Sequence, residues 1–134
     1  SLHIVEDFRE CDFGAFENKN YRELAEDPRY QQWIDSGGTL TFPGGESPEN
    51  FKVRSCLAFE RTVEQIVHMG IDRANLMVHG GTIMSIMERY ARPSGDYYQW
   101  HVECGRGYRL ALCPESWGRE KILAQISKIG QDET

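Results

Sequence analysis

The sequence predicts a layered α/β fold in which helices cover a sheet. Two observations lead to this prediction. The expected elements follow one another in the order helix, helix, strand, helix, strand, strand, helix. In addition, the stretch 75–78 is short and apolar on both faces, which is typical of a central strand in a parallel sheet. The sequence offers no other strand of that kind, so the strands that should flank it are missing from the prediction.

The first half of the chain is predicted to contain three helices. A residue that can cap a helix stands before each of them, and a proline occupies the first position of the second and the third. The longest helix carries an apolar stripe with helical spacing and ends at a glycine. The predicted helices span 21–26, 28–36 and 48–69.

In the second half, the buried strand turns directly into a helix at 83–90, for which Thr82 is the expected cap. Two further strands are predicted at 99–104 and 108–113, and the Gly-Arg-Gly turn between them suggests a hairpin. A final helix is predicted at 118–129, where four apolar residues fall on one side.

Length and composition predict a single domain over 1–134 with a polar tail at 131–134, because 134 residues with 40% hydrophobic content suffice for one core only. The net charge of -6 argues against nucleic acid as a partner, since phosphate backbones are bound by basic patches. No apolar run approaches the ~20 residues that span a membrane, and no signal-peptide pattern is visible.

The four cysteines are widely spaced, without a C-x-x-C pair and without histidines at metal-ligand spacing. This pattern predicts neither a metal site nor a small disulfide scaffold. Free thiols are typical of a reducing compartment, so a cytoplasmic location is expected.

His79 stands where the predicted strand 75–78 ends and the next helix begins. The turn at such a junction directs backbone N–H groups and the positive end of the helix at one point, which favours an anion. Gly80 and Gly81 let the main chain approach a ligand closely. An imidazole can donate a hydrogen bond to phosphate oxygen, or act as acid, base or nucleophile near neutral pH. The alternative is a histidine with a structural role in the turn.

Glu10 and Glu46 are acidic residues in loop-like segments, whereas most other glutamates fit helix surfaces or caps. The loop 39–46 is rich in Gly and Pro and is a candidate to border a site. A carboxyl group beside an anion site could protonate a leaving oxygen. The alternative for either residue is a solvated side chain. His3 and His101 are expected to be structural, and His68 to be a favourable cation at the end of a helix or a surface residue.

Three segments resemble, in order, the motifs of a known family. The first is Phe-Arg-Glu-Cys-Asp-Phe-Gly-Ala-Phe-Glu at 8–17, the second is Phe-Pro-Gly-Gly-Glu-Ser at 42–47 followed by Arg54, and the third is Asn-Leu-Met-Val-His-Gly-Gly-Thr at 75–82. Together they resemble the histidine phosphatase superfamily, the group that contains phosphoglycerate mutases and α-ribazole phosphatase. The similarity runs from about residue 4 to residue 113, and three ordered motifs are more specific than any one alone.

The resemblance implies roles for individual residues. Glu10 would be the general acid that protonates the leaving alcohol. His79 would be the second active-site histidine, in contact with the transferred phosphoryl group, with the Gly80 amide nearby. The run Gly45-Glu46-Ser47 would border the substrate pocket, and Arg54 matches a position with a structural role. The resemblance implies no metal and no cofactor.

The chain departs from the family pattern in one important respect. The nucleophile of the family is a histidine in an Arg-His-Gly motif on the first strand, followed by a second phosphate-binding arginine, and neither motif occurs here. The chain therefore resembles the C-terminal portion of a three-layer sandwich with helices on both sides of a mostly parallel sheet, without its first strands. By itself it is expected to lack the attacking histidine.

The function that follows is hydrolysis of a small phosphomonoester. About 35 residues separate Glu10 from the Gly-Glu-Ser motif, too few for the insertion of phosphoglycerate mutases, which favours a phosphatase. The alternatives are a mutase-like phosphotransferase and a non-catalytic phosphate-binding or interaction module. The expected partners are a phosphorylated metabolite or inorganic phosphate, and either a second copy of the chain or a missing N-terminal segment.

Overall fold

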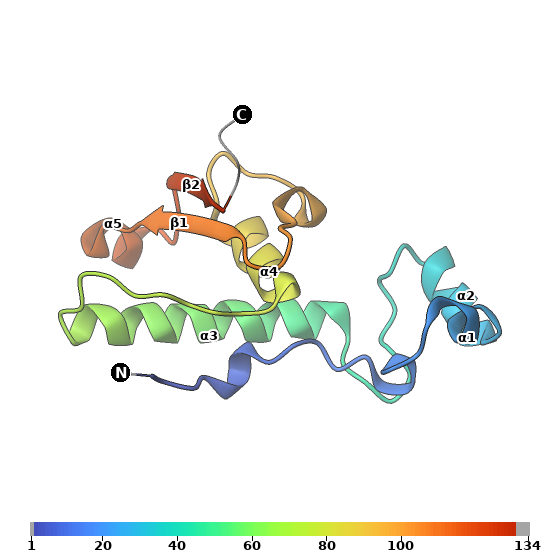
Figure 1. Cartoon of the computed structure of the whole chain (residues 1–134). Helices are drawn as coiled ribbons and strands as arrows, with labels where there is room; N and C mark the ends of the chain where they lie inside the picture. Colours follow the sequence, from blue (N-terminus) through green and yellow to red (C-terminus); the bar gives the residue numbers. More distant parts are fainter. Residues whose placement is uncertain (1, 131–134) are drawn as a thin grey trace.

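The computed structural model describes residues 2–130, which form helices and a small sheet (Figure 1). The α-helices are α1 (Tyr21–Ala25), α2 (Pro28–Asp35), α3 (Pro48–His68), α4 (Gly80–Tyr90) and α5 (Pro114–Arg119). The strands are β1 (Gly107–Ala111) and β2 (Gln125–Ile129), and short 3-10 helices lie at Glu6–Phe8, Gly14–Phe16 and Tyr97–Trp100. The predicted polar tail at 131–134 lies outside the described residues.

The three helices predicted in the first half are confirmed, and local capping explains them. The side chains of Asn20, Asp27 and Ser47 accept hydrogen bonds from backbone N–H groups in the first turns of α1, α2 and α3, at 2.9, 2.9 and 3.0 Å. These bonds satisfy donors that have no partner inside a helix. Pro28 and Pro48 occupy the first turns of α2 and α3, where no N–H is required.

The strand predicted at 75–78 is not formed among the described residues. The segment runs back along α3 (Figure 1), and most of it is exposed, with Met77 98% accessible. A strand is defined by hydrogen bonds to a neighbouring strand, and the structure offers this segment none within residues 2–130. The prediction of a strand at 75–78 was therefore wrong for the described residues, because an apolar pattern alone does not supply a pairing partner.

The predicted start of the next helix was also wrong. Helix α4 begins at Gly80, and its N-cap residue is His79, not Thr82. Thr82 is fully buried inside the first turn, and its hydroxyl donates a hydrogen bond of 3.5 Å to the carbonyl of Phe8. The hydroxyl thus ties α4 to the N-terminal segment.

The C-terminal hairpin and the final helix were predicted wrongly. Residues of the predicted strand 99–104 form the end of a 3-10 helix and a loop, whereas β1 lies within the predicted strand 108–113 apart from its first residue. β1 pairs antiparallel with β2, in a register that places Gly107 opposite Ile129. β2 occupies part of the stretch predicted as helix 118–129. Apolar residues in short runs fit both the helical period and the strand period. Pairing with a distant strand then decides which structure forms.

The described residues thus combine helices with a two-stranded antiparallel sheet, consistent with the α/β class. The predicted mostly parallel sheet between two helix layers is not present among residues 2–130. The parallel pairing in this part of the chain is one isolated bridge between Ala91 and Leu123. A parallel sheet needs several strands with helical crossovers, and the described segments supply none that pair in this way.

Two hydrophobic clusters hold the molecule together. In the larger one, which joins α3, α4 and α5, the rings of Phe59, Tyr90 and Trp117 lie 5.1 to 5.8 Å apart. The smaller one lies beneath α1 and α2 and is built from aromatic rings, including Phe16 and Phe42. In Figure 1, α1 and α2 stand at one end of the molecule, away from the sheet. In residues 2–130 no helix is both long and apolar enough to cross a membrane.

Candidate functional site

The first and third motifs meet at the N-terminus of α4. His79 Nδ1 lies 3.8 Å from Glu10 Oε2, although 69 positions separate the two residues in the sequence. Both side chains are accessible, His79 to 59% and Glu10 to 38%. The pair therefore forms an open acid–imidazole site to which a ligand has access, with an attractive interaction whenever the imidazole is protonated.

The Glu10 carboxylate is oriented by the main chain around it. Its Oε1 atom accepts a hydrogen bond of 2.9 Å from the Cys11 N–H, which leaves Oε2 toward His79. A Cβ at Gly81 would lie 3.1 Å from Oε1 and 3.1 Å from the Phe51 ring. The absence of a side chain at Gly81 thus makes room for the carboxylate beside α4.

His79 occupies the N-cap position of α4 with extended backbone angles, and its side chain makes no capping hydrogen bond. The imidazole is therefore available for a ligand. The N–H groups in the first turn of an α-helix have no partner within the helix, and the macrodipole adds positive potential there. Gly80, which was predicted to lie near the phosphoryl group, is the first residue of α4. Its amide is therefore one of these unpaired N–H groups.

The second motif lies close to the first but is engaged in a different way. Glu46 forms an ion pair with Arg54, with Oε1 2.8 Å from Nη2 and Oε2 3.0 Å from Nε. This pairing lowers the pKa of Glu46 below its ordinary value of 4.5. Ser47 caps α3. The Gly45-Glu46-Ser47 run thus has structural partners of its own, and its role as a border of the substrate pocket stays a prediction.

The loops of the first and second motifs interlock through glycines. A Cβ at Gly14 would lie 2.2 Å from the carbonyl oxygen of Pro43, and one at Gly45 would lie 2.4 Å from that of Asp12. Gly14 also has a φ of +54°, which favours glycine. Backbone hydrogen bonds cross the contact, from Ala15 N–H to Pro43 at 2.7 Å and from Glu46 N–H to Asp12 at 2.8 Å.

Sequence reasoning missed Tyr97, which the structure brings to the third motif. Its hydroxyl donates a hydrogen bond of 3.4 Å to the carbonyl of Gly81, and burial raises its pKa to about 12. The Lys52 ammonium lies 4.5 Å from the centre of its ring. No local pattern could have identified Tyr97, because its partners are 16 and 45 positions away.

Cys11 is next to Glu10 but is not a suitable nucleophile. Its thiol is buried, and burial followed by the nearby negative charge of Glu46 raises its pKa to about 12. The thiolate, which is the reactive form, is therefore scarce near neutral pH. Within residues 2–130 no three His, Cys, Asp or Glu side chains gather closely enough to hold a metal ion.

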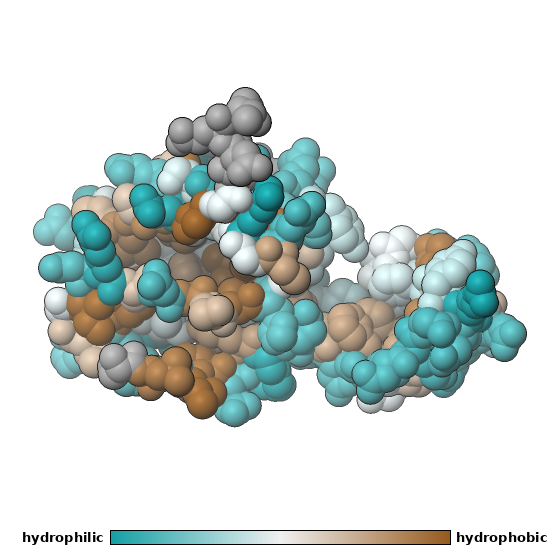
Figure 2. Space-filling view, in the orientation of Figure 1, coloured by the Kyte–Doolittle hydropathy of each residue, from teal (hydrophilic) through white to brown (hydrophobic). Residues whose placement is uncertain are grey.

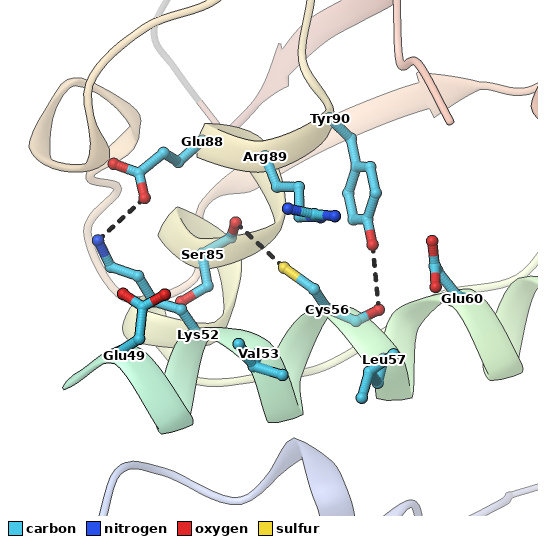
Figure 3. Close-up of a pocket in the computed structure, with 10 residues that line it drawn as sticks. All are labelled: Glu49, Lys52, Val53, Cys56, Leu57, Glu60, Ser85, Glu88, Arg89 and Tyr90. Carbon is cyan, nitrogen blue, oxygen red and sulfur yellow. Dashed lines mark hydrogen bonds and ion pairs between the residues drawn. The ribbon is translucent and has the colours of Figure 1, made fainter. Parts of the chain in front are cut away.

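A separate pocket of about 400 Å³ lies between α3 and α4 (Figure 3). The Lys52 ammonium is 2.9 Å from the Glu88 carboxylate, and the thiol of Cys56 and the hydroxyl of Tyr90 are bonded to backbone carbonyls. Its lining includes three glutamates but only one lysine and one arginine. This excess of carboxylates opposes phosphate, so the pocket does not compete with the His79 site for an anionic ligand.

Comparison with known proteins agrees with the order of these motifs. A family model described as the histidine phosphatase superfamily, branch 1, matches residues 1–120. No curated protein and no solved structure matches the chain. The family match covers most of the 134 residues and includes all three motifs. The chain therefore belongs to the histidine phosphatase superfamily.

Proposed function

We propose that the protein hydrolyses a small phosphomonoester, and that this chain supplies the general acid and a phosphate-binding histidine. The observation that supports this most strongly is the 3.8 Å separation of Glu10 and His79 at the start of α4. One group can release a proton, and the other stands where backbone donors and the helix dipole favour a phosphoryl group. Membership of the superfamily supports phosphatase or mutase-type chemistry in general.

In the proposed mechanism a histidine outside this sequence attacks phosphorus. The bond between phosphorus and the ester oxygen breaks as the bond to the histidine nitrogen forms, and Glu10 gives its proton to the departing oxygen. Water then attacks the phosphohistidine and gives a proton to the Glu10 carboxylate, which releases inorganic phosphate. His79 and the first amides of α4 stabilise the charge on the phosphoryl oxygens throughout.

We favour a phosphatase of the α-ribazole phosphatase kind over a mutase. The segment between Glu10 and Gly45 is 35 positions long and forms only α1, α2, a 3-10 helix and loops. A mutase must hold its phosphorylated intermediate away from water, and a longer covering segment would serve that purpose. The open position of His79, 59% accessible, fits hydrolysis better than phosphoryl retention.

Association with another segment is part of the proposal. Leu2, Ile4 and Met77 are 89%, 81% and 98% accessible, and Figure 2 shows brown surface over the N-terminal arm below α3. We propose that a second copy or an N-terminal segment covers these residues. In the completed three-layer sandwich, 75–78 would then be the central strand of a mostly parallel sheet with helices on both sides. Light scattering at micromolar concentration should detect an oligomer, and a strictly monomeric mass would exclude self-association.

The four cysteines are free. This supports our proposal that the protein resides in a reducing compartment such as the cytoplasm.

The assay that tests the function compares two forms with p-nitrophenyl phosphate as substrate. One is the 134-residue chain, and the other is lengthened at its N-terminus by a segment that carries an Arg-His-Gly motif. We expect hydrolysis by the lengthened form only, its loss in His79→Ala, and in Glu10→Ala a far larger loss with an alkyl phosphate than with p-nitrophenyl phosphate. Hydrolysis by the 134-residue chain that depends on His79 would show that the nucleophile is not missing. An unchanged rate in Glu10→Ala with an alkyl phosphate, whose leaving oxygen needs a proton, would exclude the general acid.

A non-catalytic phosphate-binding module is the second candidate, because the sequence carries no Arg-His-Gly motif. It predicts that phosphate shifts the NMR signals of the His79 ring in both forms, while neither form hydrolyses the ester. Detectable turnover by the lengthened form would rule out this candidate.

A further inference from the structure

We propose that Arg54 is a positioning residue for the reaction: its guanidinium fixes the main chain of Glu10 to the Glu46 loop without contacting the substrate. This inference rests on the proposed function and adds to it a residue that acts through Glu10. Arg54 lies in the second turn of α3, and its side chain is only 13% accessible. It is therefore shielded from the solvent that surrounds the His79 ring.

All five N–H donors of the Arg54 guanidinium have a partner. Nη1 donates to the backbone carbonyls of Asp7 at 2.7 Å and of Arg9 at 2.9 Å, and Nη2 donates to that of Glu10 at 3.4 Å. Nε and Nη2 donate to the two carboxylate oxygens of Glu46. A guanidinium has five such donors in total, so none remains for a phosphoryl oxygen.

These bonds connect the two loops to one rigid helix. Three of the acceptors are carbonyls of the segment that ends in Glu10, and they are 44 to 47 positions away from Arg54 in the sequence. The Glu46 carboxylate is only 17% accessible, so the ion pair is weakly screened by water. Removing the guanidinium would leave this carboxylate and the three carbonyls without their donor.

The guanidinium also lies in a stack that reaches the acid. Its central carbon is 5.2 Å from the centre of the Phe51 ring, and Phe51 packs against the open Cα of Gly81, beside the Glu10 carboxylate. Arg54 therefore supports Glu10 both through the main chain and through the ring beneath it. A lysine could not replace it, because a single ammonium cannot span acceptors on both loops with a planar fork.

Two substrates with different leaving groups distinguish a positioning role of Arg54 from a general effect on stability. Loss of a general acid slows the release of an alkyl alcohol far more than the release of p-nitrophenolate, which is a weak base. In the lengthened form, we expect Arg54→Ala to lower kcat/KM for an alkyl phosphate at least about ten-fold more than for p-nitrophenyl phosphate. Arg54→Lys should show the same larger loss of kcat/KM for the alkyl phosphate. This variant replaces Arg54→Ala in the test if Arg54→Ala fails to fold.

Arg61→Ala is the matched control, because Arg61 lies on the same helix and pairs with the exposed side chain of Asp7. This variant should leave the ratio of the kcat/KM values for the two substrates unchanged. If Arg54 acts through Glu10, the ratio should not change further when Arg54→Lys is added to Glu10→Gln. A ratio that Glu10→Gln alters but Arg54→Lys and Arg54→Ala do not would overturn the inference.

If no form hydrolyses either ester, the proposed function has failed, and hydrogen exchange decides whether Arg54 fixes the main chain of Glu10 to the Glu46 loop. Arg54→Ala, or Arg54→Lys in its place, should speed amide exchange at least about ten-fold in the peptides covering 7–17 and 42–47, whereas Arg61→Ala should not. Exchange that stays at the wild-type rate in both peptides would contradict the inference. Faster exchange confined to these peptides would support it.

Discussion

At the scale of single residues, the site depends on space for the Glu10 carboxylate and on a His79 ring that makes no capping hydrogen bond. Gly81 has no side chain where the Glu10 carboxylate lies, and the His79 ring is not used as a cap. Glu10 and His79 were identified from the sequence as candidate site residues, and the structure brings them within 3.8 Å of each other. Tyr97 and the full set of Arg54 contacts could not be predicted, because they join segments that are far apart in the chain.

The Glu46–Arg54 pair predicts a dependence of stability on pH. The pKa of Glu46 is lower in the folded protein than its ordinary value of 4.5, because Arg54 stabilises the carboxylate. The pair therefore stabilises the fold fully above that value, and the contribution is lost as pH falls through the lower, folded pKa. Denaturant titrations at about pH 6 and about pH 3 should show a larger loss of unfolding free energy in the wild type than in Glu46→Gln.

The matched comparison is Asp27, which is paired with Arg29 on α2 and is not part of the loop contact. Its pKa is also lowered, to about 2, by the hydrogen bond from Arg29. Asp27→Asn, introduced into both the wild type and Glu46→Gln, should leave the difference between their losses of unfolding free energy unchanged. Equal losses in the wild type and in Glu46→Gln would contradict the assignment.

Gly81 predicts a second result at this scale. Gly81→Ala would place a methyl group 3.1 Å from Glu10 Oε1 and from the Phe51 ring, so the carboxylate or the ring must move. We expect a loss of about 1–3 kcal/mol in unfolding free energy, measured by urea titration. Gly80→Ala is the control, because a Cβ there meets nothing within 4 Å. If the two variants are equally stable, Gly81 is not required for the close approach.

At the scale of elements, local signals predicted the three helices of the first half well, and the strands and the final helix poorly. Asn20, Asp27 and Ser47 each cap a helix through hydrogen bonds that span two or three residues, so the sequence alone contains the information. The partner of β1 is not its neighbour in sequence but β2, which follows α5. Leu123 and Ile126 had helical spacing, yet Leu123 is buried against Ala91 through a parallel bridge.

The packing of α5 gives a prediction for the larger core. Trp117 is 4% accessible, and its ring lies 5.7 Å from Phe59 and 5.1 Å from Tyr90. Trp117→Ala should lower the unfolding free energy by about 3–5 kcal/mol in urea titrations, because it removes a large buried ring and leaves a cavity.

Trp117→Phe provides the control for that experiment. The indole nitrogen of Trp117 is buried and finds no hydrogen-bond partner within the described residues. A phenyl ring keeps most of the contacts and removes this unpaired donor, so the loss should be much smaller than in Trp117→Ala. Similar losses in both variants would show that the aromatic contacts are not what α5 contributes.

At the scale of the whole molecule, the family assignment and the fold give complementary information. The family model matches residues 1–120, yet among residues 2–130 the sheet has only two strands. The segment 75–78 was predicted as a central strand from its apolar character, but the structure forms no strand there and leaves Met77 98% accessible. Sequence reasoning could identify the motifs, but it could not supply partners for this segment, because pairing depends on chains brought together in space.

The central claim is that this chain provides Glu10 and His79 but not the attacking histidine. Mass spectrometry of the acid-sensitive phosphoenzyme, trapped after mixing with substrate, tests it most directly. The account predicts phosphate on the histidine of the added Arg-His-Gly segment in the lengthened form, slower formation in Glu10→Ala, and no phosphate on the chain alone. Phosphate bound covalently to His79 of the 134-residue chain would contradict it.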